Sequence, residues 1–393
     1  MALLKDLIVD AYVTTTRPAA RRVRASDRTN SARSTVAADA DHLQAALNWL
    51  CRAQDVGDDD GVAAMYSLLQ GWVASYPETT GYIIPSFFDC AANFADGGLR
   101  RRAIAMAEWL RRCQRKDGAF CGLFADRPAP PRVFNTGQAM FGLLRAARET
   151  GDDSFLSSAT SAAEWLIAAQ DKDGAWRRHT LNNIPHAYNV RTAWALAQLA
   201  QAVNDERLLG SAIRAADWTV GRQCSTGWFA ENTFNRDDRL ATLHTIAYSM
   251  RGLLEVAAIA DRKDYTDCAL AAALALRDIW NRDRIIAGAY DSNWSQGVNW
   301  RCLPGECQLA IVWLRLDQVL GRKEFAEAAH ELLQGVKAMQ FMNVNNADLL
   351  GGLTASWPVD APYERYCLVN WGPKFLIDAL LLKGRTDGGH PTG

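Results

Sequence analysis

The side chains best suited to acid–base chemistry recur at equivalent places in this sequence. His186, in "NNIPHAYNVRTAW", and His244, in "LATLHTIAY", each stand at the start of an apolar segment, in a chain with six histidines. A lone histidine is usually structural, but two that converge on one site favour proton transfer. Glu78 and Glu306 open two further apolar segments, where an unpaired carboxylate would be costly. These four residues and Tyr188 are the candidate catalytic residues.

Many residues able to bind a polar ligand surround these candidates. They are polar or aromatic, and they lie just before the apolar segments or in their first turns. An asparagine at such a place is also a common helix cap. Cys302 and Cys307 are expected to pack rather than to act as nucleophiles. The candidate ligand-binding residues are Tyr76, Tyr82, Asn135, Gln138, Asn189, Arg191, Tyr248, Asp291, Trp294, Trp300, Arg301, Trp357, Tyr363, Tyr366, Trp371 and Lys374.

The apolar segments alternate with six copies of a repeat. Three copies align readily: "AEWLRRCQRKDGAF" from Ala107, "AEWLIAAQDKDGAW" from Ala163 and "ADWTVGRQCSTGWF" from Ala216. Each copy predicts an amphipathic helix that ends at a glycine-containing turn, because glycine readily adopts the left-handed conformation that stops a helix. The other three copies surround Trp49, Trp280 and Leu333.

The segments between the copies predict six further helices, apolar on most sides as buried helices are. Six outer helices alternating with six inner helices predict an all-α fold, a closed (α/α)6 toroid. We expect a single toroid domain over residues 39–383, an arginine-rich extension over residues 1–38 and a tail over residues 384–393. The loops that lead into the inner helices then converge on one mouth. Helix N-termini at this mouth favour an anionic or polar ligand.

Composition excludes several classes of protein. Of the 393 residues 49% are hydrophobic, and the net charge is −1, which allows a large core and argues against a nucleic-acid binder. No apolar run reaches the roughly 18 to 20 residues that span a bilayer. Nine scattered cysteines predict reduced, mostly buried thiols and a cytoplasmic location. No pair of His or Cys residues has zinc-site spacing, so we expect neither a metal nor another cofactor.

Six arginines cluster near the N-terminus, with Asp27 as the single opposing charge among them. We interpret the cluster as a solvated extension, with contact to a partner or an anionic surface as the alternative. The arginines are Arg17, Arg21, Arg22, Arg24, Arg28 and Arg33.

Two kinds of sequence resemblance follow from these segments. The turns "QDKDGAW" and "QRKDGAF" resemble the QW motifs of squalene-type terpene cyclases and protein prenyltransferases, although the acidic box and the zinc residues of those enzymes are absent. "SYPETTGYIIPSFFD", "VFNTGQAMFGLLRA", "NIPHAYNVRTAWAL" and "VNWRCLPGECQLAIVWLRL" resemble toroid proteins of bacterial exopolysaccharide gene clusters, over roughly residues 60–382. They are also distantly similar to the helical domains of uronyl C5-epimerases and polysaccharide lyases, and to N-acylglucosamine 2-epimerases.

The second resemblance implies a carbohydrate-active enzyme of polysaccharide biosynthesis or modification that acts on a glycan or sugar in the mouth. In such lyases and epimerases, Asn or Arg stabilises a uronate carboxylate as an enolate, while Tyr or His moves the C5 proton. By that similarity, His186, Tyr188, Asn189 and Arg191 supply these groups, with His244 as a further acid or base. This implies an epimerase or a lyase.

Three alternatives stay open at this point. A glycoside hydrolase would use two carboxylates, drawn from Glu78, Asp291 and Glu306. A terpenoid cyclase or prenyltransferase-like enzyme would line its mouth mainly with aromatic and aliphatic side chains. A non-catalytic glycan-binding scaffold would still bind after His186 and His244 were replaced by alanine.

Overall fold

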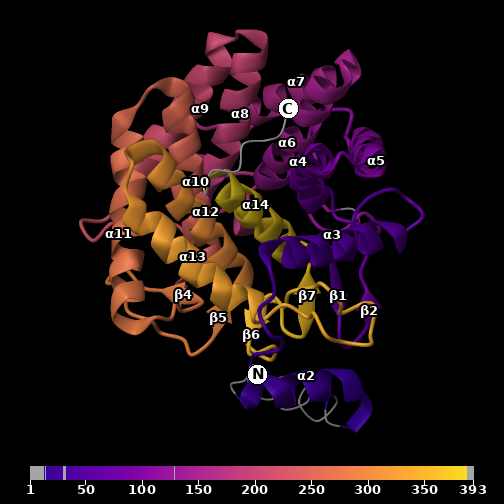
Figure 1. The fold of residues 1–393 in the computed structure, drawn as a ribbon. Helices are drawn as coiled ribbons and strands as arrows, with labels where there is room; N and C mark the ends of the chain where they lie inside the picture. Colours follow the sequence, from indigo (N-terminus) through magenta and orange to yellow (C-terminus); the bar gives the residue numbers. More distant parts are fainter. Residues whose placement is uncertain (1–12, 14, 30–31, 128, 387–393) are drawn as a thin grey trace.

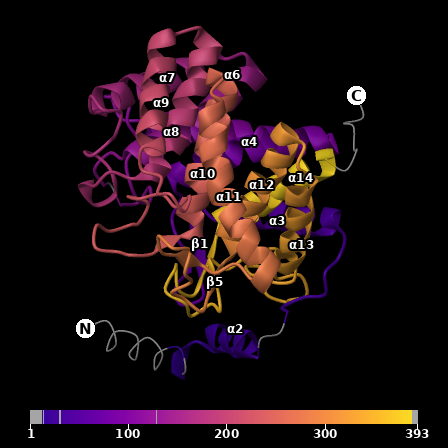
Figure 2. The same ribbon diagram turned by 90° about the vertical axis from the view of Figure 1, so that its left-hand side faces the viewer.

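Helices dominate the computed structural model of the protein, which describes residues 13, 15–29, 32–127 and 129–386. Twelve of its helices form an inner and an outer ring (Figures 1 and 2). Neighbouring inner helices pack against one another around the ring, and α14 closes it against α4. The inner helices are α4 (Pro77–Phe94), α6 (Val133–Thr150), α8 (Val190–Val203), α10 (Leu243–Ala260), α12 (Leu303–Leu320) and α14 (Trp371–Thr386). The outer helices are α3 (Asp39–Asp55), α5 (Gly97–Cys113), α7 (Asp153–Ala169), α9 (Glu206–Val220), α11 (Lys263–Asp283) and α13 (Lys323–Lys337).

Tight two-residue turns join the first five inner helices to the outer helices that follow. The residue that ends each of these inner helices has left-handed backbone geometry, as at Gly151 (φ 71°) and Asn204 (φ 53°). An aspartate then caps three of the outer helices; Asp96, for example, accepts hydrogen bonds from the backbone N–H groups of Gly98 and Leu99. We call this face of the toroid the short-turn end.

Long connections join the outer helices to the next inner helices and gather at the opposite face, the long-loop end. They contain two 3-10 turns, η1 (Leu181–Asn183) and η2 (Ala187–Asn189), and short antiparallel strands. Strands this short give no alternation that a sequence pattern can reveal, and the sequence did not predict them. β1 (Met65–Ser67) pairs with β2 (Gly71–Trp72) and β7 (Cys367–Val369), β3 (Ala241–Thr242) with β4 (Ala289–Tyr290), and β5 (Arg301–Cys302) with β6 (Ser356–Trp357).

Glutamines at the ends of the outer helices hold the outer ring together. The Gln170 Nε2 donates to the carbonyl oxygen of Gly174 in its own turn (3.0 Å) and to that of Ser211 in the next outer helix (3.1 Å). A Cβ atom on Gly174 would lie 2.1 Å from a carbonyl oxygen of α9, so only glycine allows this close approach. The QW-like turns therefore have a packing role, and we call these contacts the glutamine clamps. Equivalent clamps are made by Gln54, Gln114, Gln223 and Gln340.

The N-terminal helix α2 (Pro18–Arg28) lies outside the rings, beside the long-loop end (Figure 1). The buried Asp27 forms an ion pair with Arg33 (2.7 Å). Asp360, in the loop before α14, pairs with Arg24 (3.2 Å) and Arg28 (3.1 Å). Three arginines of the sequence cluster thus bind carboxylates of the same chain, while contact with a partner or an anionic surface stays a prediction.

The all-α (α/α)6 toroid predicted from the repeat is confirmed, and each predicted helical segment contributes to its own helix. The last inner segment was predicted to begin at Cys367, but its first residues form strand β7 and its helix begins at Trp371. The predicted tail, residues 384–393, lies largely outside the described residues. None of the nine cysteines forms a disulfide, and Cys302 and Cys307 are buried. Among the described residues, none of the helices has the length and apolarity needed to cross a bilayer.

Candidate functional site

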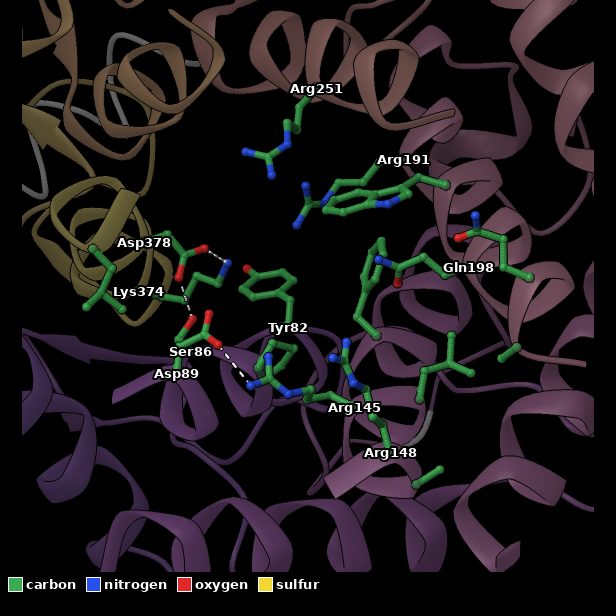
Figure 3. Close-up of a pocket in the computed structure, with 18 of the residues that line it drawn as sticks. Tyr82, Ser86, Asp89, Arg145, Arg148, Arg191, Gln198, Arg251, Lys374 and Asp378 are labelled. Atoms are coloured by element: carbon green, nitrogen blue, oxygen red, sulfur yellow. Dashed lines mark hydrogen bonds and ion pairs between the residues drawn. The ribbon is translucent and has the colours of Figure 1, made fainter. Parts of the chain in front are cut away.

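A cavity of about 680 Å³ lies inside the inner ring (Figure 3). All six inner helices contribute to its lining, so we call it the axial cavity. It extends from Tyr82 and Arg191, near the starts of α4 and α8, to Gly151 and Asp153 at the short-turn end. The sequence predicted a mouth at the long-loop end. The exposed part of this lining instead lies at the short-turn end, because the long connections fold over the starts of the inner helices.

Arg191 is a buried cation in the lining of the axial cavity. Its Nε donates to Gln138 Oε1 (2.7 Å), and its guanidinium lies within 6 Å of five aromatic rings, including that of Tyr248 at 4.8 Å. Its exposed fraction is only 5%, and its hydrogen-bond partner is the neutral Gln138 amide. Within the described residues no carboxylate lies at ion-pair distance from it, and Glu78 and Asp378 act on it only from farther away. Burial therefore lowers its pKa. A buried charge without a counter-ion is costly, which favours a site built for an anion.

Glu78 stands in the first turn of α4, where its carboxylate interacts electrostatically with Arg191. Its Oε2 accepts a hydrogen bond from the Tyr76 hydroxyl (2.6 Å), and that hydroxyl accepts one from the Asn135 amide (3.1 Å). Burial raises the pKa of Glu78 to about 7, while Tyr76 and Arg191 act in the opposite direction. A carboxyl group with this pKa exchanges protons readily near neutral pH.

His244 occupies the first turn of α10, the inner helix opposite α4 in the ring. Its ring contacts those of Tyr248 (4.4 Å between centroids) and Tyr363 (5.9 Å). Burial, followed by the charge of Arg191, lowers the pKa of His244 to about 3, so its imidazole is neutral at physiological pH. We call Glu78, Arg191 and His244 the axial cluster.

Tyrosines and a lysine complete the surroundings of the axial cluster. Burial raises the pKa of Tyr82, Tyr188 and Tyr248, so these hydroxyls stay protonated and can act as hydrogen-bond donors. Lys374 lies over the Tyr82 ring at 5.3 Å and forms an ion pair with Asp378. Burial lowers the pKa of this lysine to about 8.

Buried polar atoms without a hydrogen-bond partner gather in the same region. Tyr248 and Gln308 line a small pocket that shares Arg191, Arg251 and Lys374 with the axial cavity, so a hydroxylated ligand there could bond their unsatisfied atoms. Among the described residues, the unsatisfied atoms of this region are Gln138 Nε2, Asn189 Nδ2, His244 Nδ1, Tyr248 Oη and both polar atoms of the Gln308 side chain.

The second predicted histidine has a different environment. His186 is buried in the loop before α8, and its two ring nitrogens lie against the carbonyl oxygens of Thr233 (3.0 Å) and Leu181 (2.9 Å). Neither nitrogen is directed at a substrate. The ring stacks on Tyr188 at 4.6 Å, so His186 supports Tyr188 and is not part of the axial cluster.

Glu306 is also held by a structural partner. Both of its carboxylate oxygens accept hydrogen bonds from Arg301, at 2.8 and 2.6 Å, and its side chain is fully buried. This bidentate pair satisfies the charges of both residues and leaves neither free to bind a ligand. The predicted catalytic Glu306 and ligand-binding Arg301 therefore form a scaffold contact of the β5 region.

The remaining candidates of the long loops make turn and packing contacts. Asp291 is a turn residue whose Oδ1 accepts from the N–H groups of Asn293 and Ser295 (both 2.9 Å). Trp300 packs on Tyr363 (6.3 Å), and the Trp371 Nε1 donates to the same tyrosine's hydroxyl (3.1 Å). The other three also lie away from the axial cavity: Trp294 donates to the Thr226 carbonyl, Trp357 lies beside Arg301, and Tyr366 is buried against α2.

Several lining residues of the axial cavity were not predicted. They lie one to four turns into the inner helices, whereas the residues predicted from the sequence lie in the loops and first turns. A 3.6-residue period counted from Tyr82 and Gln138 marks Ser86, Asp89 and Phe141 on the same helix faces, so the signal was available. The missed residues include Ser86, Asp89, Phe141, Arg145, Arg148, Trp194, Gln198, Arg251, Gln308 and Asp378.

The fold and the cavity place the chain among the (α/α)6 toroids, and comparisons of sequence and structure agree. The profile of the ulvan lyase N-terminal domain family matches residues 131–303, which include Arg191 and His244. None of the curated proteins matches the sequence significantly.

Solved structures of similar fold cover most of the chain. A sugar epimerase from a ruminal bacterium has a TM-score of 0.73 at 14% identity, covering 90% of this chain and 98% of its own. Cellobiose 2-epimerase from Bacillus thermoamylovorans B4167 has a TM-score of 0.70 at 12% identity, covering 86% and 97%. The unsaturated glucuronyl hydrolase of Bacillus sp. GL1 has a TM-score of 0.67 at 15% identity, covering 88% and 96%. At these identities the likeness establishes the fold.

Proposed function

We propose that the protein is a carbohydrate-active enzyme that moves a proton beside the carboxylate of a uronate sugar, leading to epimerisation or β-elimination. The observation that carries the proposal is Arg191, a buried arginine whose hydrogen-bond partner is a neutral amide and whose charge acts on both Glu78 and His244. An arginine in this state suits a substrate carboxylate, and its charge then stabilises the enolate that forms when the neighbouring C–H bond breaks. The names of the matched family and of the similar structures support a sugar substrate.

The positions of the two titratable groups suggest their roles. Glu78 and His244 lie in the first turns of opposite inner helices. Arg191 lines the axial cavity and they do not, so the proposal places the reacting sugar at the Arg191 end of the cavity, between the two groups. When a substrate carboxylate neutralises Arg191, the repulsion between Arg191 and a protonated His244 decreases, and the pKa of His244 rises. The same neutralisation raises the pKa of Glu78 further, which keeps its proton in place. Substrate binding thus prepares His244 as the base and Glu78 as the acid.

The two reactions share their first step. His244 removes the C5 proton, and the electron pair of the C–H bond moves toward the carboxylate held by Arg191. In epimerisation, Glu78 returns a proton to C5 on the opposite face. In β-elimination, the electron pair forms a C4–C5 double bond, the C4–O bond breaks, and the Glu78 proton goes to the leaving oxygen.

The test is incubation of the protein with uronate-containing glycans in D2O. Deuterium at C5 without cleavage is expected for an epimerase, and ultraviolet absorbance of the new double bond for a lyase. H244Q should abolish either signal, while H186Q serves as the matched control, since it replaces a buried histidine outside the axial cluster. If glycans bind and neither signal develops, or if H244Q retains full activity, the proton-transfer proposal is wrong.

Hydrolysis is a second candidate, favoured by the pKa of about 7 of Glu78, which suits the general acid of a glycosidase. Its second carboxylate would be Asp378 rather than Glu306 or Asp291, because Asp378 lines the axial cavity, although Lys374 and Ser86 now engage it. New reducing ends without deuterium at C5 or a double bond would support this reaction. The cationic lining argues against a terpenoid substrate.

A further inference from the structure

A second group of cations lies in the axial cavity next to Arg191. Arg251, in the third turn of α10, and Lys374, in the first turn of α14, line the cavity together with Arg191. Figure 3 shows the guanidinium groups of Arg191 and Arg251 pointing from neighbouring helices into the same space. Both guanidinium carbons lie 5.3 Å from the centre of the Trp194 ring, which lies beside both of them.

The carboxylates near these cations do not balance their charge. Glu255 pairs with Arg251 (2.8 Å) and equally with Arg315 (2.9 Å), so it is shared between two arginines. Asp378 pairs with Lys374 and accepts a hydrogen bond from the Ser86 hydroxyl (2.6 Å). Three cations therefore share two carboxylates, and Arg191 pairs with neither. Burial, followed by the charges of Arg191 and Arg251, lowers the pKa of Lys374, in keeping with three like charges placed around the same space.

We propose that Arg251 and Lys374, next to Arg191, form a second anion subsite that holds an acidic group on the sugar adjacent to the reacting one. An anion placed among three like charges removes their repulsion, and guanidinium groups bind carboxylate and sulfate oxygens with directed hydrogen bonds. This inference rests on the proposed function and specifies its substrate as an acidic oligosaccharide. The anionic group is a carboxylate or a sulfate ester, because both present the same oxyanion chemistry.

The shape of the cavity indicates the direction from which such a chain enters. The lining continues from Arg251 past Gln198 to Arg148 and Ala202, which are exposed at the short-turn end. A volume of about 680 Å³ falls in the range of sites that enclose a drug-sized ligand. Six cations and three carboxylates line the cavity, so an acidic chain meets a net positive charge along the whole path. The glycan therefore extends outward through the short-turn end.

Calorimetric titration of the full-length protein with uronate mono-, di- and trisaccharides tests the subsite. A neutral trisaccharide and a sulfated trisaccharide form two further arms, which separate carboxylate from sulfate recognition. We expect the acidic trisaccharide to bind more tightly than the monosaccharide. R251Q and K374Q should weaken trisaccharide binding roughly 10- to 100-fold, the range for losing one charge-assisted hydrogen bond. Monosaccharide binding should change much less.

R315Q is the matched control, because Arg315 pairs with the same Glu255 but does not line the axial cavity. If R315Q weakens trisaccharide binding as much as R251Q, the effect comes from Glu255 and the subsite is wrong. Equal affinity for neutral and acidic trisaccharides would also overturn it. Because R251Q leaves Glu255 paired with Arg315, we expect it to fold, and circular dichroism checks this.

An obstruction at the rim tests the direction of entry. A202W places a large side chain on the exposed lining at the short-turn end, whereas L123W places one on an exposed residue of a long loop. A202W should slow trisaccharide association at least about tenfold, and L123W should leave it unchanged. The reverse result would assign entry to the long-loop end.

The binding results are independent of turnover, so the two proposals can fail separately. Trisaccharide binding that depends on Arg251, without proton exchange in D2O, would keep the subsite and reject the proton chemistry. Exchange on the acidic trisaccharide, with trisaccharide affinity that R251Q and K374Q do not change, would keep the chemistry and reject the subsite.

Discussion

Two arginines in this protein, the half-buried Arg301 and the buried Arg191, differ in what surrounds them. Arg301, at the long-loop end, forms two hydrogen bonds with the fully buried Glu306. Arg191, on the toroid axis, has a neutral amide and aromatic rings around it. A satisfied pair stabilises the fold it belongs to, whereas an unsatisfied charge is retained where a ligand completes it.

The two histidines of the predicted site also differ in whether their ring nitrogens have hydrogen-bond partners. Both are buried, but the nitrogens of His186 lie against loop carbonyls, while His244 Nδ1 has no hydrogen-bond partner among the described residues. The long-loop end therefore provides scaffold, and the axis provides unsatisfied groups. Substitutions in the two regions should separate activity from stability.

The largest effect should follow R191Q. Removing the positive charge should slow C5 proton exchange on an acidic glycan by about 10³-fold or more, as losses of transition-state charge stabilisation do. Stability should not decrease, because an unpaired buried charge is removed. Exchange rates from NMR and the Tm from calorimetry measure both. A rate within tenfold of the unsubstituted protein would contradict the role of Arg191.

The opposite pattern is expected for E306Q. The substitution leaves the half-buried Arg301 without its counter-ion, which should lower the free energy of unfolding by about 3–5 kcal/mol. The exchange rate per folded molecule should stay within a factor of about two to three. Urea unfolding followed by tryptophan fluorescence gives the stability. If activity falls while stability is kept, Glu306 belongs to the site after all.

E78Q should have an intermediate effect on activity and should change how kcat/KM depends on pH. If Glu78 donates its proton, kcat/KM should decrease as the pH rises above about 7, where the free enzyme loses that proton. E78Q should be about 10²-fold slower and should lose this limb of the profile. The folded-state pKa is raised, so the ionisation also reduces stability as the pH rises from about 4.3 to 7, and E78Q should remove that dependence. A rate that increases through pH 7 would make Glu78 the base.

The smallest effect should follow D291A. Its carboxylate organises a surface turn through two backbone N–H groups, so we expect a loss of about 0.5–1.5 kcal/mol in unfolding free energy. The exchange rate and the products should not change. Any marked loss of activity would restore Asp291 as a candidate carboxylate of the site.

The sequence predicted the toroid because the repeat is carried by outer-helix tryptophans and glycine turns, such as Trp165 and Gly174, whose packing has a fixed spacing. It also placed Glu78, Arg191 and His244 among the candidates, since first turns of inner helices converge. It could not separate His244 from His186, because carbonyl contacts with Leu181 and Thr233 depend on how two long loops fold.

The composition of the loops does not reveal at which end of the toroid the cavity is exposed. Polar and aromatic residues in long connections were interpreted as ligand contacts, but a pair such as Arg301 and Glu306 satisfies itself. Arg251 and Asp378 lie in segments whose overall apolar character concealed them. Once it is known which faces of these helices point inward, both residues can be assigned to the cavity lining.

The glutamine clamps have a consequence for chain topology. Gln340 joins the last outer helix to the His42 carbonyl of the first (3.1 Å), the same contact that Gln170 makes between α7 and α9. Lys383, in α14, pairs with Asp39 at the start of α3 (2.6 Å). The contacts that close the ring between its last and first helices are thus of the same kind as those between consecutive outer helices. A circular permutant whose termini lie in the turn between α8 and α9, with Thr386 linked to Asp39, should assemble the same ring.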